Sequence, residues 1–177
     1  TALICGCGVQ AAAQLRALTS VSRLERIYAY DLDAQRAAAF AALLQGETRV
    51  PITPVADLAA AVAASDIVIT CTTARRYFIE HAMVRPGTFI AGVGADNEDK
   101  QELDPQLLAA STVVADSIDQ CAVIGDLHHA IAAKAMSRTD VHAELGQIVA
   151  GIKPARCSPE QIIVFDSTGT ALQDVAA

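Results

Sequence analysis

The turn after the first apolar segment constrains the fold of this chain more than any other feature. Residues 2–5 form a short apolar run, residues 6–11 read Gly-Cys-Gly-Val-Gln-Ala, and a helical pattern covers residues 9–18. In a Gly-x-Gly-x-x-Ala turn, the first glycine permits a tight bend, the second lets a ligand approach the backbone, and the small last residue allows close helix–strand packing. The pattern therefore predicts a strand–helix unit whose helix N-terminus binds phosphate groups.

The alternation of short apolar runs with helical patterns continues along the whole chain. We expect strands at residues 2–5, 26–30, 49–53, 66–71, 88–93, 112–115 and 162–165. We expect helices at residues 9–18, 34–44, 55–64, 105–110, 140–150 and 170–175, with Ser117 as a candidate start of another. Apolar strands that alternate with helices are typical of a parallel sheet covered on both faces. The sequence therefore predicts an α/β fold of the Rossmann type, with a doubly wound, mostly parallel sheet.

Length and composition favour one compact domain that handles a small molecule. The chain has 177 residues, 53% of them hydrophobic, and a formal net charge of −7. This apolar content is enough for a sizeable core, while the negative charge leaves no basic surface for nucleic acid or anionic lipid. Because no targeting segment and no apolar run of about 20 residues is present, we expect a cytoplasmic protein.

The five cysteines are expected to be free thiols that bind no metal. Their spacing matches neither a disulfide framework nor the paired ligands of a zinc site. Cys5 and Cys7 stand two residues apart, and we expect them to face the same side of a strand. The adjacent His128 and His129 point in different directions on any helix, so we interpret them as surface or interface residues.

An acidic residue at the end of the second predicted strand indicates which dinucleotide binds. Asp31 follows the glycine turn by about twenty residues, where a carboxylate holds the ribose hydroxyls of the adenosine. An aspartate there repels the 2′-phosphate of NADP, and no arginine follows it directly. The pattern favours NAD. The alternative is that the glycines only form a turn and Asp31 caps the next helix.

Polar residues follow three later strands, at the edge of the sheet where ligands bind in such folds. Thr72 and Thr73 come after the fourth strand, as cofactor contacts or as an ordinary turn. The loop at residues 92–100 contains Asp96 and Lys100 and is the best candidate for chemistry, because a carboxylate beside a nicotinamide can exchange a proton with the substrate. The alternative is a solvated acidic loop with Lys100 as its counter-charge. Residues 166–168 are expected to cap the last helix.

Several segments resemble the ornithine cyclodeaminase/mu-crystallin family. They are residues 6–10, 93–96, 100–104, 143–146 and 164–169, followed by residues 172–174. The resemblance covers nearly the whole chain, and the last segment, Val-Phe-Asp-Ser-Thr-Gly, is the most specific. It implies a homodimeric enzyme in which residues 1–177 form the NAD-binding domain. A missing N-terminal part would form the dimer interface and bind the carboxylate of an amino acid.

The family motifs also imply roles for single residues. The cofactor contacts would be Gly6, Gly8, Val9, Gln10, Asp31, Thr72, Val93, Gly94, Lys100 and Ser167. Asp96 would be the catalytic acid/base, and Asp96 and Thr168 would contact the substrate.

The resemblance leaves the reaction open. A cyclodeaminase would convert L-ornithine into L-proline and ammonia by hydride transfer to and from bound NAD, whereas an alanine dehydrogenase or an imine or ketimine reductase would use NAD or NADH as a true reactant. Residues 97–99 are Asn-Glu-Asp, where cyclodeaminases tend to have Cys-Pro-Gly. A mu-crystallin-like binding protein without catalysis is a further alternative, against which the retained Asp96 argues.

Overall fold

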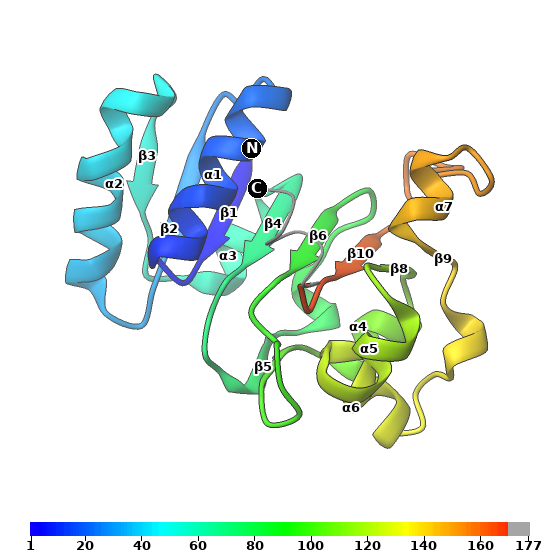
Figure 1. The fold of residues 1–177 in the computed structure, drawn as a ribbon. Helices are drawn as coiled ribbons and strands as arrows, with labels where there is room; N and C mark the ends of the chain where they lie inside the picture. The colour runs from blue at the N-terminus through cyan, green and yellow to red at the C-terminus, as the bar shows by residue number, and fades with distance from the viewer. Residues whose placement is uncertain (170–177) are drawn as a thin grey trace.

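A parallel sheet of eight strands forms the centre of the computed structural model, which describes residues 1–169 (Figure 1). The strand order is β3-β2-β1-β4-β6-β10-β8-β9, and every neighbouring pair is parallel. The strands are β1 (Ala2–Cys5), β2 (Ile27–Tyr30), β3 (Ile52–Pro54), β4 (Ile67–Thr70), β6 (Phe89–Gly92), β8 (Thr112–Ala115), β9 (Ala143–Glu144) and β10 (Ile163–Asp166). The predicted Rossmann-type fold is confirmed.

The described residues contain seven helices, six of which pack on the two faces of the sheet. They are α1 (Val9–Val21), α2 (Ala34–Thr48), α3 (Leu58–Ala63), α4 (Pro105–Ala109), α5 (Ile118–Ile124), α6 (Asp126–Ala132) and α7 (Leu145–Val149). Side chains of α1 and α2 pack in one hydrophobic cluster, and those of α3, α4, α5 and α6 pack in another. Successive residues of a strand point to opposite faces, so Leu3 of β1 joins the second cluster and its neighbour Ile4 the first. The sheet is therefore doubly wound.

The order of the strands creates a crevice at one edge of the sheet. From β1 the chain runs through β2 to β3 on one side, then returns to place β4 on the other side of β1. The loops after β1 and β4 leave the sheet in opposite directions at such a reversal, and ligands bind in the gap between them. The structure therefore positions a binding site at the carboxyl ends of β1 and β4.

The helices expected from residues 9, 34 and 105, and after Ser117, begin there, whereas the helix expected at residues 55–64 begins only at Leu58. Asp33 accepts hydrogen bonds from two backbone N–H groups at the start of α2, and Asp57, Asp104 and Ser117 cap α3, α4 and α5 in the same way. The alternative that Asp31 caps α2 is wrong, because Asp33 does so. The predicted helix at residues 170–175 lies outside the described residues.

The prediction for residues 140–150 is wrong over most of its length. A 3-10 turn (Arg138–Asp140) is followed by the short strand β9, and only Leu145–Val149 is α-helical. The backbone N–H of His142 donates to the carbonyl of Val113 at 2.9 Å, so this segment joins the edge of the sheet. A pairing across about thirty residues is not visible in local periodicity.

Two strands and one helix were missed altogether. Strands β5 (Arg75–Ile79) and β7 (Gln101–Leu103) form a separate two-stranded parallel sheet, and no element was predicted at the residues of α6. A further 3-10 turn covers His81–Met83. These elements are too short for a clear periodic signal, and their pairing partners lie far away in the sequence. They matter because they support the loop that carries Asp96.

The cysteines are all free, as predicted, but Cys5 and Cys7 do not share a face. Cys5 packs in the cluster of α3–α6, and Cys7 packs in the cluster of α1 and α2. Between them, Gly6 has a φ of +85° and turns the chain out of the strand. Burial, the largest cause, raises the pKa of the Cys7 thiol to about 12.

Candidate functional site

The glycine turn lies against the loop that follows β4. The N–H of Gly6 donates to the carbonyl of Tyr30 at 2.9 Å, which ties the turn to β2. A Cβ on Gly6 would lie 2.6 Å from the carbonyl oxygen of Cys71 and 2.8 Å from the methyl group of Thr72. Because φ at this residue also lies in the left-handed region, Gly6 is required by both backbone and packing.

Gly8 faces open space. A Cβ there would have no atom within 4 Å, and its φ of −97° is accessible to any residue. Gly8 is also the N-cap of α1, and no side chain caps that helix. The first turn of α1 therefore presents backbone N–H donors and the positive end of the helix dipole to an open cradle, an arrangement that suits a phosphate group.

Asp31 is held at the end of β2, beside the glycine turn. Its Oδ2 accepts the N–H of Cys7 at 2.9 Å, and its Oδ1 accepts the N–H of Asp33 at 3.0 Å. A carboxylate has about four acceptor positions, so both oxygens can accept further donors from a ligand. Asp31 lines a cavity of about 680 Å³ with Gly6, Gly8 and Arg36.

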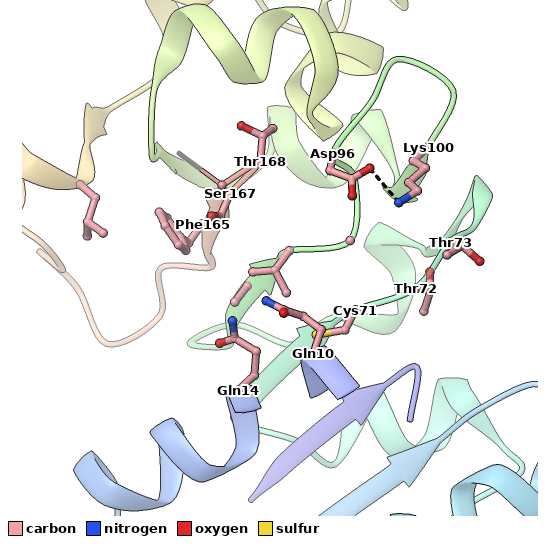
Figure 2. A pocket seen from close by; sticks show the side chains of 15 residues that line it. Gln10, Gln14, Cys71, Thr72, Thr73, Asp96, Lys100, Phe165, Ser167 and Thr168 are labelled. Atoms are coloured by element: carbon pink, nitrogen blue, oxygen red, sulfur yellow. Dashed lines mark ion pairs between the residues drawn. The ribbon is translucent and has the colours of Figure 1, made fainter. Parts of the chain in front are cut away.

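A second cavity of about 530 Å³ adjoins the first, and Cys71, Thr72 and Thr73 line both. Figure 2 shows its side chains, with Gln10 and Gln14 projecting from α1. The other lining residues are Ala91, Val93, Gly94, Asp96, Lys100, Leu145, Phe165, Ser167, Thr168 and Gly169. Two adjoining cavities along the carboxyl edge of the sheet have room for the two halves of a dinucleotide.

The structure brings eleven of the twelve predicted site residues to these cavities. Gly6, Gly8 and Asp31 line the first, Thr72 lines both, and the others line the second. Val9 is the exception, because its side chain is 92% exposed and lines neither cavity. Sequence reasoning missed Gln14 and Phe165, which lie in regular elements and carry no local signal.

Asp96 and Lys100 form an ion pair at the wall of the second cavity. The Nζ of Lys100 lies 2.7 Å from Oδ1 of Asp96, and the two side chains point toward one another in Figure 2. The Lys100 side chain is 20% exposed and that of Asp96 56%, so the pair lies at a partly enclosed surface. Lys100 is the local counter-charge of Asp96, and both side chains line the cavity. A chemical role for the loop remains a prediction.

The histidine pair supports this loop. Nε2 of His129 donates to the backbone carbonyl of Lys100 at 2.8 Å, and Nδ1 of His128 lies 3.3 Å from the carbonyl oxygen of Ala122. Both rings are half-buried. The prediction that these are surface or interface residues remains a prediction, and the structure adds that the His129 ring contacts the backbone of the loop that carries Asp96.

A buried carboxylate that sequence reasoning missed lies beneath the cavity wall. Glu102 in β7 is fully buried, and its side chain accepts hydrogen bonds from Thr70, Thr72 and Gly94. Burial raises the pKa of Glu102, although these hydrogen bonds oppose the shift. The hydroxyl of Thr72 is engaged by Glu102, so Thr73 carries the exposed hydroxyl of the pair.

Two more aspartates fix the segment after β10. Asp116 accepts the hydroxyl of Ser167 at 3.1 Å and the N–H of Thr168 at 2.9 Å. The carboxylate of Asp166 accepts the N–H groups of Asp126 and Leu127 and thereby holds the start of α6. The helix that residues 166–168 are expected to cap lies outside the described residues. Burial raises the pKa of Asp166 to about 7.

Within residues 1–169, no three His, Cys, Asp or Glu side chains are grouped so that they could hold a metal ion. No helix in this part of the chain has both the length and the apolar character needed to cross a membrane.

Comparisons with known proteins agree with the fold. An alanine dehydrogenase from Archaeoglobus fulgidus is 36% identical over 97% of this chain and 52% of its own length. The structure of Δ1-pyrroline-2-carboxylate reductase from Thermococcus litoralis, in complex with NADH and L-proline, superposes with a TM-score of 0.94 at 34% identity. It covers 98% of this chain and 54% of that one. Iminosuccinate reductase from Paracoccus denitrificans, in complex with NAD+, gives a TM-score of 0.90 at 34% identity, covering 99% and 53% of the two chains.

The chain spans about half the length of these relatives. The model of the ornithine cyclodeaminase/mu-crystallin family matches residues 1–177, which is the full chain. With the strand order, the glycine turn and the Asp96 loop in place, this match identifies the family. The chain belongs to the ornithine cyclodeaminase/mu-crystallin family.

Proposed function

We propose that this domain binds NAD and that the enzyme containing it transfers hydride between NAD and the α-carbon of a small amino acid or imino acid. The observation that carries the proposal is the Asp96–Lys100 ion pair, whose two side chains line the second cavity. That cavity also includes residues of the loop after β4, which borders the crevice between β1 and β4. A proton-exchanging group beside a dinucleotide crevice is what such a reaction requires.

The residues of the crevice fit the dinucleotide. The open space at Gly8 and the uncapped start of α1 would receive the pyrophosphate, and Asp31 would hold the adenosine ribose. Gln10, Val93, Gly94, Lys100 and Ser167 would enclose the nicotinamide end. When bound, the cofactor supplies the hydride or accepts it. Asp31 also repels a 2′-phosphate, which favours NAD over NADP.

The protein's own side chains would manage the proton. Asp96 would exchange a proton with the substrate nitrogen, and Lys100 would hold the Asp96 carboxylate at the cavity wall. Thr168, fixed by Asp116, would contact the substrate from the opposite wall. A carboxylate in this role typically contributes about 10²–10⁴-fold to the rate.

The relatives support a small substrate with nitrogen beside a carboxylate. The three relatives are named after alanine, Δ1-pyrroline-2-carboxylate and iminosuccinate. Each of these compounds has a nitrogen on the carbon next to a carboxyl group. We therefore place dehydrogenation of an amino acid, or reduction of an imino acid, first. Conversion of L-ornithine into L-proline and ammonia is the second candidate, because the family includes ornithine cyclodeaminases.

We also propose that residues 1–177 form the nucleotide-binding domain of a longer, homodimeric enzyme. The relatives are about twice as long as this chain. The remaining part would supply the groups that bind the substrate carboxylate. Residues 1–169 bring no lysine or arginine other than Lys100 to the second cavity.

One assay with the full-length protein tests the reaction. The protein is incubated with NAD and a panel of amino acids that includes alanine, proline and ornithine, while NADH and proline are both followed. NADH with Δ1-pyrroline-2-carboxylate, or with pyruvate and ammonia, tests the reverse direction. Accumulation or consumption of NADH supports the first candidate, and proline without net NADH supports the second. NADH binding without turnover in either direction would indicate a mu-crystallin-like binding protein instead.

A further inference from the structure

We propose that Glu102 is a positioning residue. Its side chain joins the two ends of the loop that carries Asp96 (residues 94–102) and ties this loop to the residues after β4. The cofactor wall at Thr72 and Gly94 is then set by one buried carboxylate. The inference rests on the proposed function, because it concerns the nicotinamide end of the same crevice. Glu102 lines neither cavity, so it would act only through its neighbours.

The contacts of Glu102 are divided evenly between its two oxygens. Oε1 accepts the N–H of Thr72 at 2.6 Å and its hydroxyl at 2.7 Å. Oε2 accepts the hydroxyl of Thr70 at 2.6 Å and the N–H of Gly94 at 2.9 Å. Each oxygen thus receives one backbone N–H, a group that can only donate. A single side chain therefore ties the end of β4 to the end of β6.

The bond to Gly94 also closes a loop. Asp96 and Lys100 lie between Gly94 and Glu102 in the sequence, so the hydrogen bond between these two residues joins the start of the segment to its end. The two side chains that form the ion pair therefore lie on a loop whose two ends are joined by a hydrogen bond. Other contacts hold the later part of this loop, namely the carbonyl of Lys100 with His129 and the N–H of Gln101, which donates to the carbonyl of Ala74 at 2.9 Å, but the bond to Glu102 fixes its start at Gly94.

Gly94 is fitted to this carboxylate. A Cβ on Gly94 would lie 2.4–2.6 Å from the three carboxylate atoms of Glu102. Gly94 is not among the residues with positive φ, so its backbone conformation does not require glycine. The close approach of the carboxylate explains why no side chain fits at this position.

The backbone of Glu102 is fixed from below. Oδ1 of Asp126, the first residue of α6, accepts the N–H of Glu102 at 2.8 Å and the N–H of Leu103 at 3.0 Å. The backbone that carries the Glu102 side chain is therefore held by the buried N-terminal end of α6. A buried charge is costly, and an apolar side chain often stabilises a core as well or better. Four donors directed at Glu102 indicate that its position serves the site above it.

The test compares Glu102→Gln with Glu102→Ala in the full-length protein, with Glu98→Gln as control. Glu98 is an exposed carboxylate in the same loop. Glutamine has about the same volume as glutamate, but its NH2 group cannot accept a hydrogen bond. In either orientation of the amide, this NH2 group faces the N–H of Thr72 or of Gly94, so one of these two hydrogen bonds is lost. We expect both Glu102 variants to bind NADH about tenfold more weakly, the effect of one or two lost hydrogen bonds. AMP, which would occupy only the end held by Asp31, should bind within about twofold of wild type.

Amide hydrogen exchange supplies a readout that is independent of turnover. In Glu102→Gln the N–H of Thr72 or of Gly94 should exchange faster, while amides of β1 and β2 keep their protection. Equal weakening of AMP and NADH, or faster exchange throughout the sheet, would show that Glu102 only stabilises the fold. NADH affinity within about twofold of wild type would also overturn the proposal. If wild type binds no NADH, the proposed function itself fails, and that outcome is distinct from these.

A double-mutant cycle tests the fit between the two residues. Gly94→Ala should weaken NADH binding about tenfold when Glu102 is present, because the methyl group displaces the carboxylate. In the Glu102→Ala background the methyl group has space, and Gly94→Ala should add little. An equal loss in both backgrounds would show that Gly94 acts independently of Glu102. If Glu102→Ala does not fold, amide hydrogen exchange at Thr72 in the Gly94→Ala variant still tests whether the methyl group displaces the Glu102 carboxylate.

Discussion

Asp126 and Asp166 are two fully buried carboxylates that share one helix end. The backbone N–H of Asp126 donates to Oδ1 of Asp166 at 3.3 Å, and the N–H of Leu127 donates to Oδ2 at 2.8 Å. Oδ1 of Asp126 accepts two backbone N–H groups, whereas its Oδ2 is buried without a hydrogen-bond partner among the described residues. Burial raises the pKa of both carboxyl groups, and their mutual repulsion adds to the shift of Asp126.

This pair predicts that the domain loses stability as the pH rises. The folded pKa of Asp166 is about 7, above the ordinary value of 3.8, so the folded state keeps a proton that the unfolded state releases. The stabilising contribution is complete below about pH 4 and is lost as the pH rises to about 7. Asp126→Asn should raise the melting temperature at pH 8, by about 2–4 °C for each kcal/mol recovered, and should change it little at pH 4. Thermal unfolding from pH 4 to 8 measures this.

The matched control for that prediction is Asp119→Asn. Asp119 is an exposed aspartate at the start of α5. If its substitution flattens the pH profile as much as Asp126→Asn, the buried pair is not the cause.

Asp96→Asn should lower kcat by about 100-fold or more in the full-length enzyme, because asparagine cannot exchange a proton. The Oδ1 atom that contacts Lys100 is retained, so NADH affinity should stay within about twofold of wild type. Stopped-flow hydride transfer and fluorescence titration separate the two effects. Asp99→Asn, in the same exposed loop, serves as control and should leave kcat unchanged. Full turnover in Asp96→Asn would remove Asp96 from the mechanism.

Two neighbouring glycines should respond differently to alanine. Gly6→Ala places a methyl group 2.6 Å from the Cys71 carbonyl at a positive φ, and should destabilise the domain by more than about 2 kcal/mol. Gly8→Ala meets no atom and should fold normally, but it should weaken NAD binding because the methyl group enters the phosphate cradle. Denaturant melts and calorimetric titration measure the two quantities. Gly46→Ala, in an open position of α2, should leave NAD binding unchanged and should stabilise the domain by up to about 1 kcal/mol, because alanine favours a helix more than glycine does. Unweakened NAD binding by Gly8→Ala would place the pyrophosphate elsewhere.

Asp31→Asn should reduce the preference for NAD over NADP. The amide oxygen can still accept the N–H of Cys7, while the charge that repels a 2′-phosphate is removed and Arg36 remains in the same cavity. We expect the ratio of the two dissociation constants to shift by about tenfold toward NADP. Asp33→Asn is the control, since asparagine also caps helices well. Equal affinity of the wild-type protein for NAD and NADP would contradict the role assigned to Asp31.

The sequence alone was enough for the fold class, the family and the position of the crevice. Those features depend on local patterns, namely the Gly-x-Gly-x-x-Ala turn at Gly6 and the apolar runs that alternate with helical patterns, each of which acts within a few residues. The predicted starts of α2 and α4 were correct, and both helices begin at a local cap, Asp33 and Asp104.

Tertiary structure alone decided which polar residues share a neighbourhood. Glu102 follows Thr72 by 30 positions, and Asp166 follows Asp126 by 40, yet both pairs are in hydrogen-bond contact, the second through the N–H of Asp126. The strand pairings at β5, β7 and β9 were invisible for the same reason. Local propensity depends on neighbours within a turn or two of the chain, whereas burial of a charge and pairing of a strand edge depend on segments that only the complete fold brings together.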